Sequence, residues 1–222
     1  MNAFLLHYPP SDRLRVDWHA NMEYKVVAKC PLDPEHIFTK RTEPLEVVPS
    51  SVGVADVMWT IYECIVSARV RSLLTKCKAT GVAFDPVVVH ATPRTKAAVS
   101  QLGECSVLRV TGWGGIASPQ CGARETERCP GCTRARYSGV ERWLQVLDET
   151  AWDGSDFFMV WPMPTHIFVT RKIAEMLAAE SLRHFRCIPV EDLRPTQGYT
   201  PGRITDWMDE TTARRQCPQL LA

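Results

Sequence analysis

The chain has 222 residues, with 26 Lys and Arg against 25 Asp and Glu, and apolar residues make up 45% of it. This length is sufficient for one or two domains with a buried core, and the apolar content excludes a chain that is disordered throughout. The formal net charge of +1 disfavours a dedicated binder of the nucleic-acid backbone, whose affinity would rest on a basic excess.

The first fifty residues are rich in proline and only weakly periodic, so we expect short strands and loops there, with the clearest strand over 24–28. No Lys or Arg precedes the short apolar run 3–6, which is unlike a secretory signal. The longest apolar run, 157–169, is interrupted by prolines and is shorter than the roughly 20 residues of a membrane helix. We therefore expect a cytoplasmic protein with no membrane partner.

A strand, an amphipathic helix and a second strand are predicted between residues 57 and 89. Residues 57–66 are β-branched and aromatic, which is typical of a strand, and Ser67 stands where a helix N-cap is expected. Gly81 suits the end of the helix, and 84–89 is the next predicted strand. The apolar stripe of the helix consists of Val70, Leu73, Leu74 and Cys77.

The same pattern returns between residues 157 and 190. Residues 157–161 are apolar, 166–169 are a predicted strand, Thr170 takes the N-cap position and 185–190 form the closing strand. Aligning 65–70 with 168–173 places cap on cap and Leu73-Leu74 on Met176-Leu177. This alignment indicates an internal duplication of a strand–helix–strand unit, although any strand followed by an amphipathic helix gives a similar pattern.

Between and after these units we expect a strand over 106–113, a glycine-rich turn over 112–115, a cysteine segment over 121–132 and a short strand or helix start over 143–147. The predicted organisation is an N-terminal α+β unit (1–100), a cysteine knuckle with the second strand–helix–strand unit (101–193), and a partly ordered C-terminal tail (194–222). The tail contains a possible short helix over 204–214.

Cys129-Pro130-Gly131-Cys132 is the sharpest local signal of chemistry. Two thiolates separated by two residues can bind one tetrahedral Zn²⁺, and Pro and Gly suit the turn that directs both sulfurs inward. Cys121, eight residues upstream, is the predicted third ligand. Four basic residues nearby could balance the charge of a thiolate site: Arg124, Arg128, Arg134 and Arg136.

The fourth ligand is open. Cys30 would tie the N-terminal segment to the middle of the chain, Cys105 is nearer in sequence, and His36 and Asp33 are further alternatives. The predicted site is one structural zinc ion held by Cys30, Cys121, Cys129 and Cys132. Two other interpretations are thiols without a metal and a redox pair; the residues after Cys132 lack the apolar helical stripe that a redox pair requires. Cys64, Cys77 and Cys187 fall in apolar positions and are expected in the core, and Cys217 in the tail.

Several strings of the C-terminal half together resemble one known family. They are Cys129-Pro130-Gly131-Cys132, Val146-Leu147-Asp148-Glu149, Asp156-Phe157-Phe158, the run 165–172 (Thr-His-Ile-Phe-Val-Thr-Arg-Lys) and the run 185–191 (Phe-Arg-Cys-Ile-Pro-Val-Glu). Over roughly residues 100–192 the chain resembles the double-CXXCG motif paralogous family of myxobacteria, whose members are regarded as immunity proteins of contact-dependent polymorphic toxin systems.

The family pattern has a first Cys-Pro-x-Cys-Gly near the N-terminus and a second C-x-x-C-G in the middle. Here Cys30-Pro31 stands at the first motif with Asp33 in place of its second cysteine, and Thr133 replaces the trailing glycine of the second motif. Cys121 matches a further cysteine that some members place before the second motif. The resemblance implies a cytoplasmic protein that neutralises a cognate toxin domain without catalysis of its own.

Motifs of catalysis are sparse. The glycines of 112–115 lack the G-x-G-x-x-G spacing, and the sequence contains neither G-x-S-x-G nor H-E-x-x-H. His90 and His166 lie at predicted strand ends and are expected to be structural. We therefore expect a non-enzymatic, zinc-binding immunity (antitoxin-like) protein that occludes a cognate toxin domain. An alternative is a zinc-containing accessory subunit that presents a substrate to a partner enzyme.

A third class, a zinc-ribbon nucleic-acid binder, would use the arginines around the cysteine segment and the aromatic rings of Trp113, Tyr137 and Trp143. Glu125 and Glu127 offset those arginines, so nucleic acid is the less expected partner. The predicted fold class is α+β, with a mixed or antiparallel sheet, two related strand–helix–strand units and a small zinc-ribbon-like cysteine knuckle.

Overall fold

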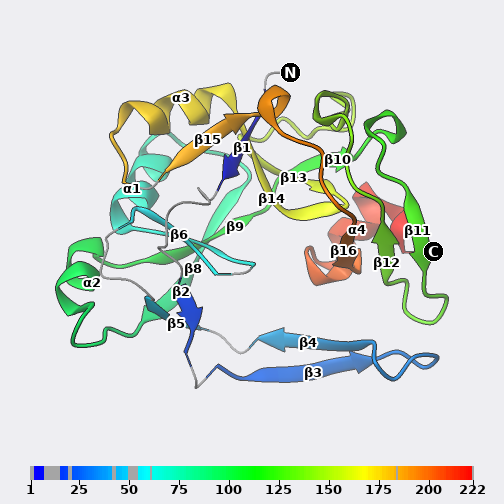
Figure 1. Cartoon of the computed structure of the whole chain (residues 1–222), viewed down its shortest axis with the longest axis horizontal. Helices are drawn as coiled ribbons and strands as arrows, with labels where there is room; N and C mark the ends of the chain where they lie inside the picture. The colour runs from blue at the N-terminus through cyan, green and yellow to red at the C-terminus, as the bar shows by residue number, and fades with distance from the viewer. Residues whose placement is uncertain are drawn as a thin grey trace.

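The computed structural model describes residues 3–7, 16–19, 22–41, 44–49, 55–60, 62–183 and 185–221. Within these ranges the chain forms four sheets and a few short helices, so the fold is α+β (Figure 1). The two larger sheets are mixed, since each contains one parallel pair among antiparallel ones.

The largest sheet has six strands in the order β2-β5-β8-β9-β7-β6. They are β2 (Val16–Trp18), β5 (Leu45–Pro49), β6 (Val57–Trp59), β7 (Cys64–Val66), β8 (Val82–Val89) and β9 (Ser106–Val110). The second sheet has the order β10-β13-β14-β1-β15. Its strands are β1 (Ala3–His7), β10 (Trp113–Ile116), β13 (Phe157–Trp161), β14 (Met163–Thr170) and β15 (Arg186–Pro189).

Two smaller sheets are formed by hairpins. One is three-stranded, in the order β11 (Glu125–Arg128), β12 (Ala135–Tyr137), β16 (Tyr199–Gly202); the other pairs β3 (Tyr24–Lys29) with β4 (Ile37–Arg41). The α-helices are α1 (Ala68–Lys76), α2 (Lys96–Leu102), α3 (Arg171–Ala179) and α4 (Glu210–Gln216). Short 3₁₀ turns lie at η1 (Pro119–Cys121), η2 (Trp143–Gln145), η3 (Val190–Asp192), η4 (Ile204–Asp206) and η5 (Pro218–Leu220).

The two strand–helix–strand segments have the same surroundings. β7-α1-β8 is preceded by β6, which pairs with β7, and β14-α3-β15 is preceded by β13, which pairs with β14. In the first sheet β9 lies between β7 and β8, and in the second β1 lies between β14 and β15, antiparallel in every case. The strand β1 therefore takes the place in the second sheet that β9 takes in the first.

The N-caps of α1 and α3 have nearly equal backbone angles. Ser67 has φ −68° and ψ 162°, and Thr170 has φ −70° and ψ 160°. The Ser67 hydroxyl accepts a hydrogen bond from the Val70 N–H, as an N-cap does, whereas the Thr170 hydroxyl donates to Asp156. The aligned cap positions thus keep their backbone geometry but differ in their side-chain bonds.

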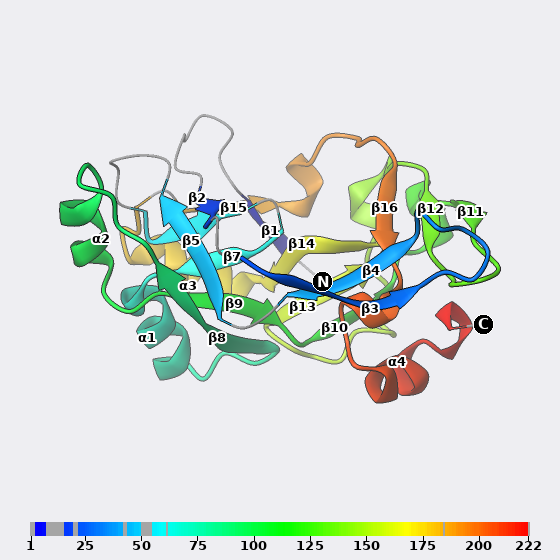
Figure 2. The ribbon, with the colours of Figure 1, turned by 90° about the horizontal axis from the view of Figure 1, so that it is seen from below.

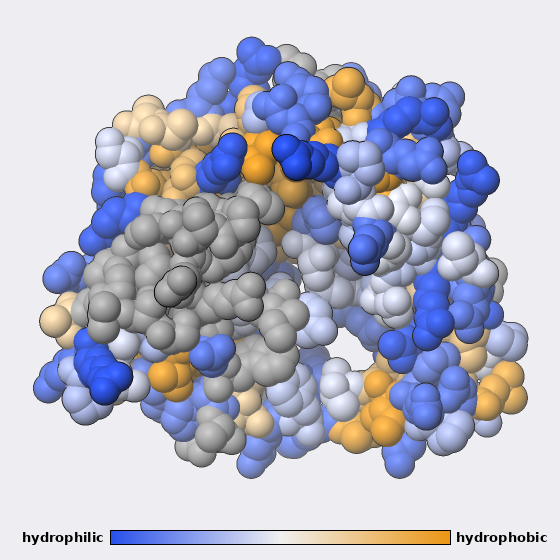
Figure 3. Space-filling model, in the orientation of Figure 1, coloured by the Kyte–Doolittle hydropathy of each residue, from blue (hydrophilic) through white to orange (hydrophobic). Residues whose placement is uncertain are grey.

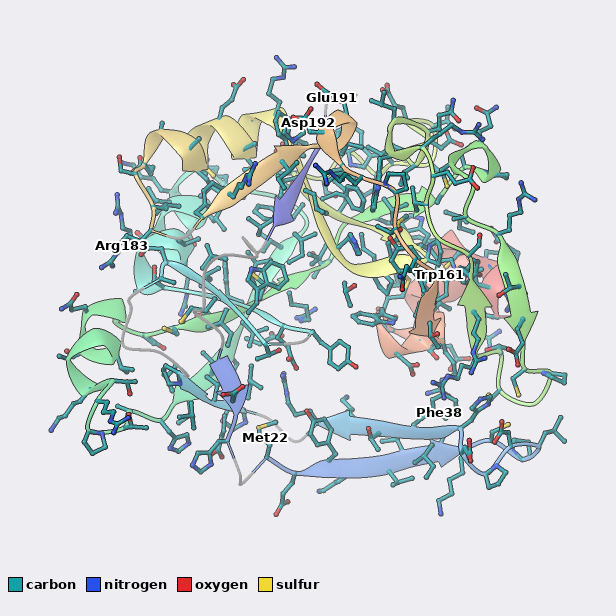
Figure 4. All side chains as sticks on the ribbon, in the orientation of Figure 1. Met22, Phe38, Trp161, Arg183, Glu191 and Asp192 are labelled. Atoms are coloured by element: carbon teal, nitrogen blue, oxygen red, sulfur yellow. The ribbon has the colours of Figure 1, made fainter. Side chains whose placement is uncertain are left out.

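We call the six-stranded sheet with α1 one half of the molecule and the five-stranded sheet with α3 the other. In each half, an aspartate accepts hydrogen bonds from the loop that follows the helix of the other half. Asp56 precedes β6, and Arg183, which is labelled in Figure 4, lies in the loop after α3. The Asp56 carboxylate accepts hydrogen bonds from the Arg183 backbone N–H at 2.9 Å and from its guanidinium at 3.3 Å. Asp156 precedes β13, and Thr80 lies in the loop after α1. The Asp156 carboxylate accepts hydrogen bonds from the Thr80 backbone N–H at 3.1 Å and from its hydroxyl at 3.3 Å. Thr80 and Arg183 each lie thirteen residues after their N-cap, so the contacts are reciprocal.

The core between these halves takes matching positions from both. Val66 and Val169, Val70 and Ile173, and Leu74 and Leu177 are buried in one cluster, together with Val57 and Phe157. The helices carry one apolar stripe each and lie side by side in Figure 1. Burial of these stripes against the two sheets joins the halves into one body.

The region 57–66, expected as a single strand, forms the hairpin β6–β7. Its turn is closed by a hydrogen bond from the Thr60 N–H to the Glu63 carbonyl, and Trp59 pairs with Cys64. Thr60 also bonds the Glu63 carboxylate, and its hydroxyl accepts from the Tyr62 N–H at 3.1 Å. These local bonds from a threonine outweigh the strand preference of the sequence around it.

The segment 194–222, expected as a partly ordered tail, is packed on the body over the described residues 194–221. β16 pairs with β12, and Trp207 donates its indole N–H to the Pro201 carbonyl at 2.7 Å. Side chains from this segment complete a buried cluster that also contains Trp113, Met159 and Trp161: Ile204, Ala213, Cys217 and Leu220. A few widely spaced apolar residues are sufficient to order this polar segment, because they are buried against residues of the five-stranded sheet.

Candidate metal centre

Two hairpin turns from distant parts of the sequence meet at one place. The turn between β3 and β4 carries Cys30 and His36, and the turn between β11 and β12 carries Cys129 and Cys132. Figures 1 and 2 both place the β3–β4 turn beside the β11–β12 hairpin. One ligand atom from each residue lies within 4.8 Å of all the others, so these four residues, the Cys3His group, could hold a metal ion.

The measured separations suit tetrahedral coordination. The sulfurs of Cys30 and Cys129 are 3.6 Å apart, and Cys132 Sγ is 3.6 Å from His36 Nδ1. A tetrahedron with Zn–S bonds of about 2.3 Å and Zn–N bonds of about 2.1 Å has edges of roughly 3.6–3.8 Å. The two cross-hairpin pairs are therefore already near the spacing that one bound ion imposes.

Backbone hydrogen bonds close each turn and bring its two ligands together. In the first turn the Cys30 N–H donates to the His36 carbonyl at 3.0 Å, and in the second the Cys129 N–H donates to the Arg134 carbonyl at 2.9 Å. Thr133, which directly follows Cys132, has a backbone φ of 60°. This is the left-handed region of backbone conformation, which favours glycine.

Gly131 lets the two turns approach closely. A Cβ atom at this position would lie 2.8 Å from Leu32 Cγ and 3.0 Å from Cys30 Sγ. Any side chain would push the first turn away from the second. The glycine between the paired cysteines is thus explained by contact with the other hairpin as well as by turn geometry.

Asp33 supports the histidine of the group. Its carboxylate oxygen Oδ2 lies 3.3 Å from His36 Nε2, while Oδ1 accepts the Glu35 N–H at 2.9 Å. A carboxylate on the far nitrogen of a metal-binding imidazole fixes the ring orientation and raises its basicity. Asp33, a possible ligand by sequence, therefore lies in the structure as the partner of a ligand.

N–H groups also act on the thiols. Burial alone would raise the pKa of Cys30, but the backbone N–H groups of Leu32 and Asp33, followed by the neighbouring thiols, lower it below the ordinary value. Burial raises the pKa of Cys132 to about 11, against a hydrogen bond from the Arg134 backbone. A bound cation would favour the thiolate at both positions.

The structure brings Cys30, Cys129 and Cys132 together but does not bring Cys121 to them. Cys121 is fully buried in a different cluster, beside Val140 and Trp143, and its sulfur accepts the Ala123 N–H at 3.4 Å. The strand β11 separates it from Cys129, and four strand residues span about 13 Å. Nearness in sequence is therefore a poor guide to the third ligand.

His36 supplies the remaining ligand atom, while Cys105 packs in the core cluster around Leu45 and Val47. By sequence, His36 is one of three alternatives to Cys30, and nothing local links it to the paired cysteines. Its spacing of six residues from Cys30, across the likewise proline-containing turn 30–36, is the signal that could have identified it.

The hairpin that carries Cys30 and His36 is weakly packed elsewhere. We call residues 24–41 the arm. Only Cys30 and Phe38 of the arm are buried, and the Arg203 guanidinium lies over the Phe38 ring at 3.5 Å. Arg41 bonds Glu63 at 2.8 Å near the other end of the arm. In Figure 1 the arm lies along the lower edge, and hydrophobic atoms are visible in that part of Figure 3.

Comparison with known protein families finds no family model that matches the chain, and comparison with curated proteins finds no matching sequence. Among the described residues, no helix has the length and apolar character required to cross a membrane.

Proposed function

We propose that the Cys3His group holds one Zn²⁺ in a zinc-ribbon-like centre. Three thiolates and an imidazole are a ligand set that zinc favours, and the observed spacing supports a tetrahedral site. Four protein ligands leave no open position for water or substrate, so the ion is structural. The free energy of zinc binding stabilises the contact between the two turns.

The consequence is a fixed position for the arm. Most arm side chains are exposed, and β3 and β4 pair only with each other among the described residues, so apolar packing does little to hold this hairpin. An isolated two-stranded hairpin is marginal in water. A zinc ion at its turn converts it into a rigid extension of the body.

The arm combines exposed apolar and basic side chains. Tyr24, Val26, Val27 and Ile37 are 43–57% exposed. The two strands also carry three exposed lysines, Lys25, Lys29 and Lys40, and no acidic residue. Such a surface fits a protein partner with an apolar patch bordered by carboxylates.

We infer a non-enzymatic immunity protein that works in the cytoplasm, with the zinc-fixed arm covering the active face of a cognate toxin domain. The observation that carries this proposal is the arm itself, an apolar and basic hairpin held to the body through the Cys3His group. The resemblance of residues 100–192 to the double-CXXCG family supports the same class of function.

Co-expression with the protein encoded by the neighbouring gene tests the proposal. We expect the two proteins to co-purify and the chain to rescue cells from the toxicity of that neighbour. Val27→Asp on the arm should weaken binding by at least about tenfold, since it places a like charge and a polar group at an apolar contact.

The matched control is Leu144→Asp, which alters an even more exposed apolar residue outside the arm, and it should bind and protect as the unmodified chain does. A chain that neither binds nor protects would exclude the immunity function. Equal loss in both variants would exclude the arm as the contact surface.

A further inference from the structure

A second group of metal-ligand side chains lies far from the Cys3His group in sequence. His19 follows β2, Glu46 is on β5 and His90 follows β8. One Glu46 oxygen, Oε2, lies 2.7 Å from His90 Nε2 and 3.6 Å from His19 Nδ1. The three ligand atoms all lie within 4.8 Å of one another.

The sheet fixes the positions of these three side chains. The strands β2, β5 and β8 are neighbours in the six-stranded sheet. The His19 N–H donates to the Glu46 carbonyl at 2.9 Å, and the His90 N–H donates to the Val47 carbonyl at 2.8 Å. The backbone of each histidine thus continues the hydrogen bonding of its strand to β5, which lies between β2 and β8. Both histidines are therefore placed next to Glu46.

The group lies on the outer face of the sheet. Leu45 and Val47, on either side of Glu46, are fully buried in the core, and side chains alternate between faces along a strand. The side chains of His19, Glu46 and His90 are 23%, 29% and 37% exposed. All three side chains are therefore mostly covered but keep part of their surface open to solvent.

The two imidazoles lie close together, each with one nitrogen near the same carboxylate oxygen. Their rings are stacked, with centroids 3.8 Å apart and planes inclined by 20°. Because ligand lone pairs lie in the ring planes, binding of one ion by both histidines requires the stacked rings to rotate apart about their side-chain bonds. An ion bound there would contact the three groups from neighbouring strands with little movement of the backbone.

We propose that His19, Glu46 and His90 form a second metal site, for a divalent first-row transition-metal ion, with open coordination positions facing solvent. Two imidazoles and one carboxylate favour ions such as Zn²⁺, Co²⁺ or Fe²⁺ over the hard cations Ca²⁺ and Mg²⁺. Three protein ligands leave at least one position for water or for a donor atom of a bound molecule. The site contains no sulfur, which distinguishes it from the Cys3His group.

Cobalt titration of the chelator-stripped protein, under reducing conditions, tests this site. We expect two Co²⁺ ions per chain to remain after gel filtration. One should give the intense near-ultraviolet band of thiolate-to-cobalt charge transfer, and the other only weak visible bands of nitrogen and oxygen ligands.

Variants separate the two sites. His90→Gln and His19→Gln should each weaken the second ion by at least about 100-fold, because even the outer partners of metal ligands cost roughly 10–100-fold. They should leave the thiolate band intact. Cys129→Ser should remove that band and leave the second ion bound. His166→Gln, which alters a histidine outside both groups, is the matched control.

Retention of a single Co²⁺, with the thiolate band, by the unmodified stripped protein would overturn the second site and leave the proposed zinc centre standing. Retention of two ions by both histidine variants would overturn it as well. Loss of the thiolate band with one ion still bound would count against the zinc centre alone.

Discussion

The core between the two strand–helix–strand segments buries matching side chains from both halves, from Val66 and Val169 to Leu74 and Leu177. The arm buries only Cys30 and Phe38 and carries its polar and apolar groups at the surface. In the core, many small contacts are shared by residues from each half. In the arm, the attachment is concentrated in a few residues: the Cys3His group at the turn, Phe38 beneath Arg203, and Arg41 paired with Glu63.

This difference predicts two kinds of response to change. In a shared core, each truncated side chain should lower the free energy of unfolding by its own amount, and equivalent substitutions in the two halves should have similar effects. An arm attached through metal ligands is either fixed or released, because removal of one ligand weakens the whole centre. Substitutions in the two regions test this difference.

The largest effect should come from Cys129→Ser. Loss of one thiolate removes most of a binding energy that is on the order of 10 kcal/mol for structural zinc, so the arm should be released while the core stays folded. Trypsin, which can cut after Lys25, Lys29 and Lys40, should then cleave the arm rapidly, as followed by mass spectrometry.

His90→Gln is the control for this measurement, since it alters a metal-ligand side chain outside the Cys3His group. Its arm should remain resistant to trypsin. Cleavage at equal rates in the zinc-loaded unmodified protein and in Cys129→Ser would show that the arm is not held through this centre.

Leu74→Ala and Leu177→Ala occupy matching positions in the two halves and are almost fully buried. Each should lower the free energy of unfolding by about 2–5 kcal/mol, by loss of apolar burial and creation of a cavity. Val27→Ala on the arm should change it by less than about 0.5 kcal/mol. Urea denaturation measures all three, and a large loss confined to one half would contradict a shared core.

Asp56→Asn and Asp156→Asn should each cost about 1–3 kcal/mol, because each carboxylate accepts hydrogen bonds from the opposite half. Burial opposes ionisation of both residues, but the hydrogen bonds from Arg183 and Ser67, and from Lys172 and Thr80, outweigh it and lower both pKa values.

A carboxyl group whose pKa is lower in the folded state stabilises the fold above its unfolded pKa and loses that contribution as the pH falls through the folded value. The unmodified protein should therefore lose stability below about pH 4, and the two variants should lose less. Denaturation curves across this range check the difference. An unchanged pH profile in both variants would contradict the role of these aspartates.

A small effect, confined to zinc binding, should come from Asp33→Asn, which removes the charge beside His36 Nε2 and leaves all four ligands in place. We expect zinc affinity to fall by about tenfold, since outer partners of metal-binding histidines orient and polarise the ring. Competition with a chromophoric chelator measures this affinity. Glu35→Gln, in the same turn, should bind zinc normally; an equal decrease in both variants would assign the effect to general charge.

Features that depend on short stretches of chain were predictable. The helical stripes after Ser67 and Thr170, the strand over 24–28 and the paired cysteines at 129 and 132 each follow from residues within a few positions of one another. Turn chemistry was less visible: Thr60 and Glu63 divide the expected strand 57–66 into a hairpin because of hydrogen bonds that a propensity pattern does not contain.

Local patterns of residues were sufficient to predict the α+β class, the amphipathic faces of the two principal helices and a local pair of thiols that one ion can bridge. Tertiary structure alone decided that His36 joins those thiols, that Cys121 is buried elsewhere, and that residues 194–221 pack on the body. The physical reason is range. Caps, turns and periodicity act over a few residues, whereas a ligand set contributed by turns about a hundred residues apart depends on how the sheets assemble.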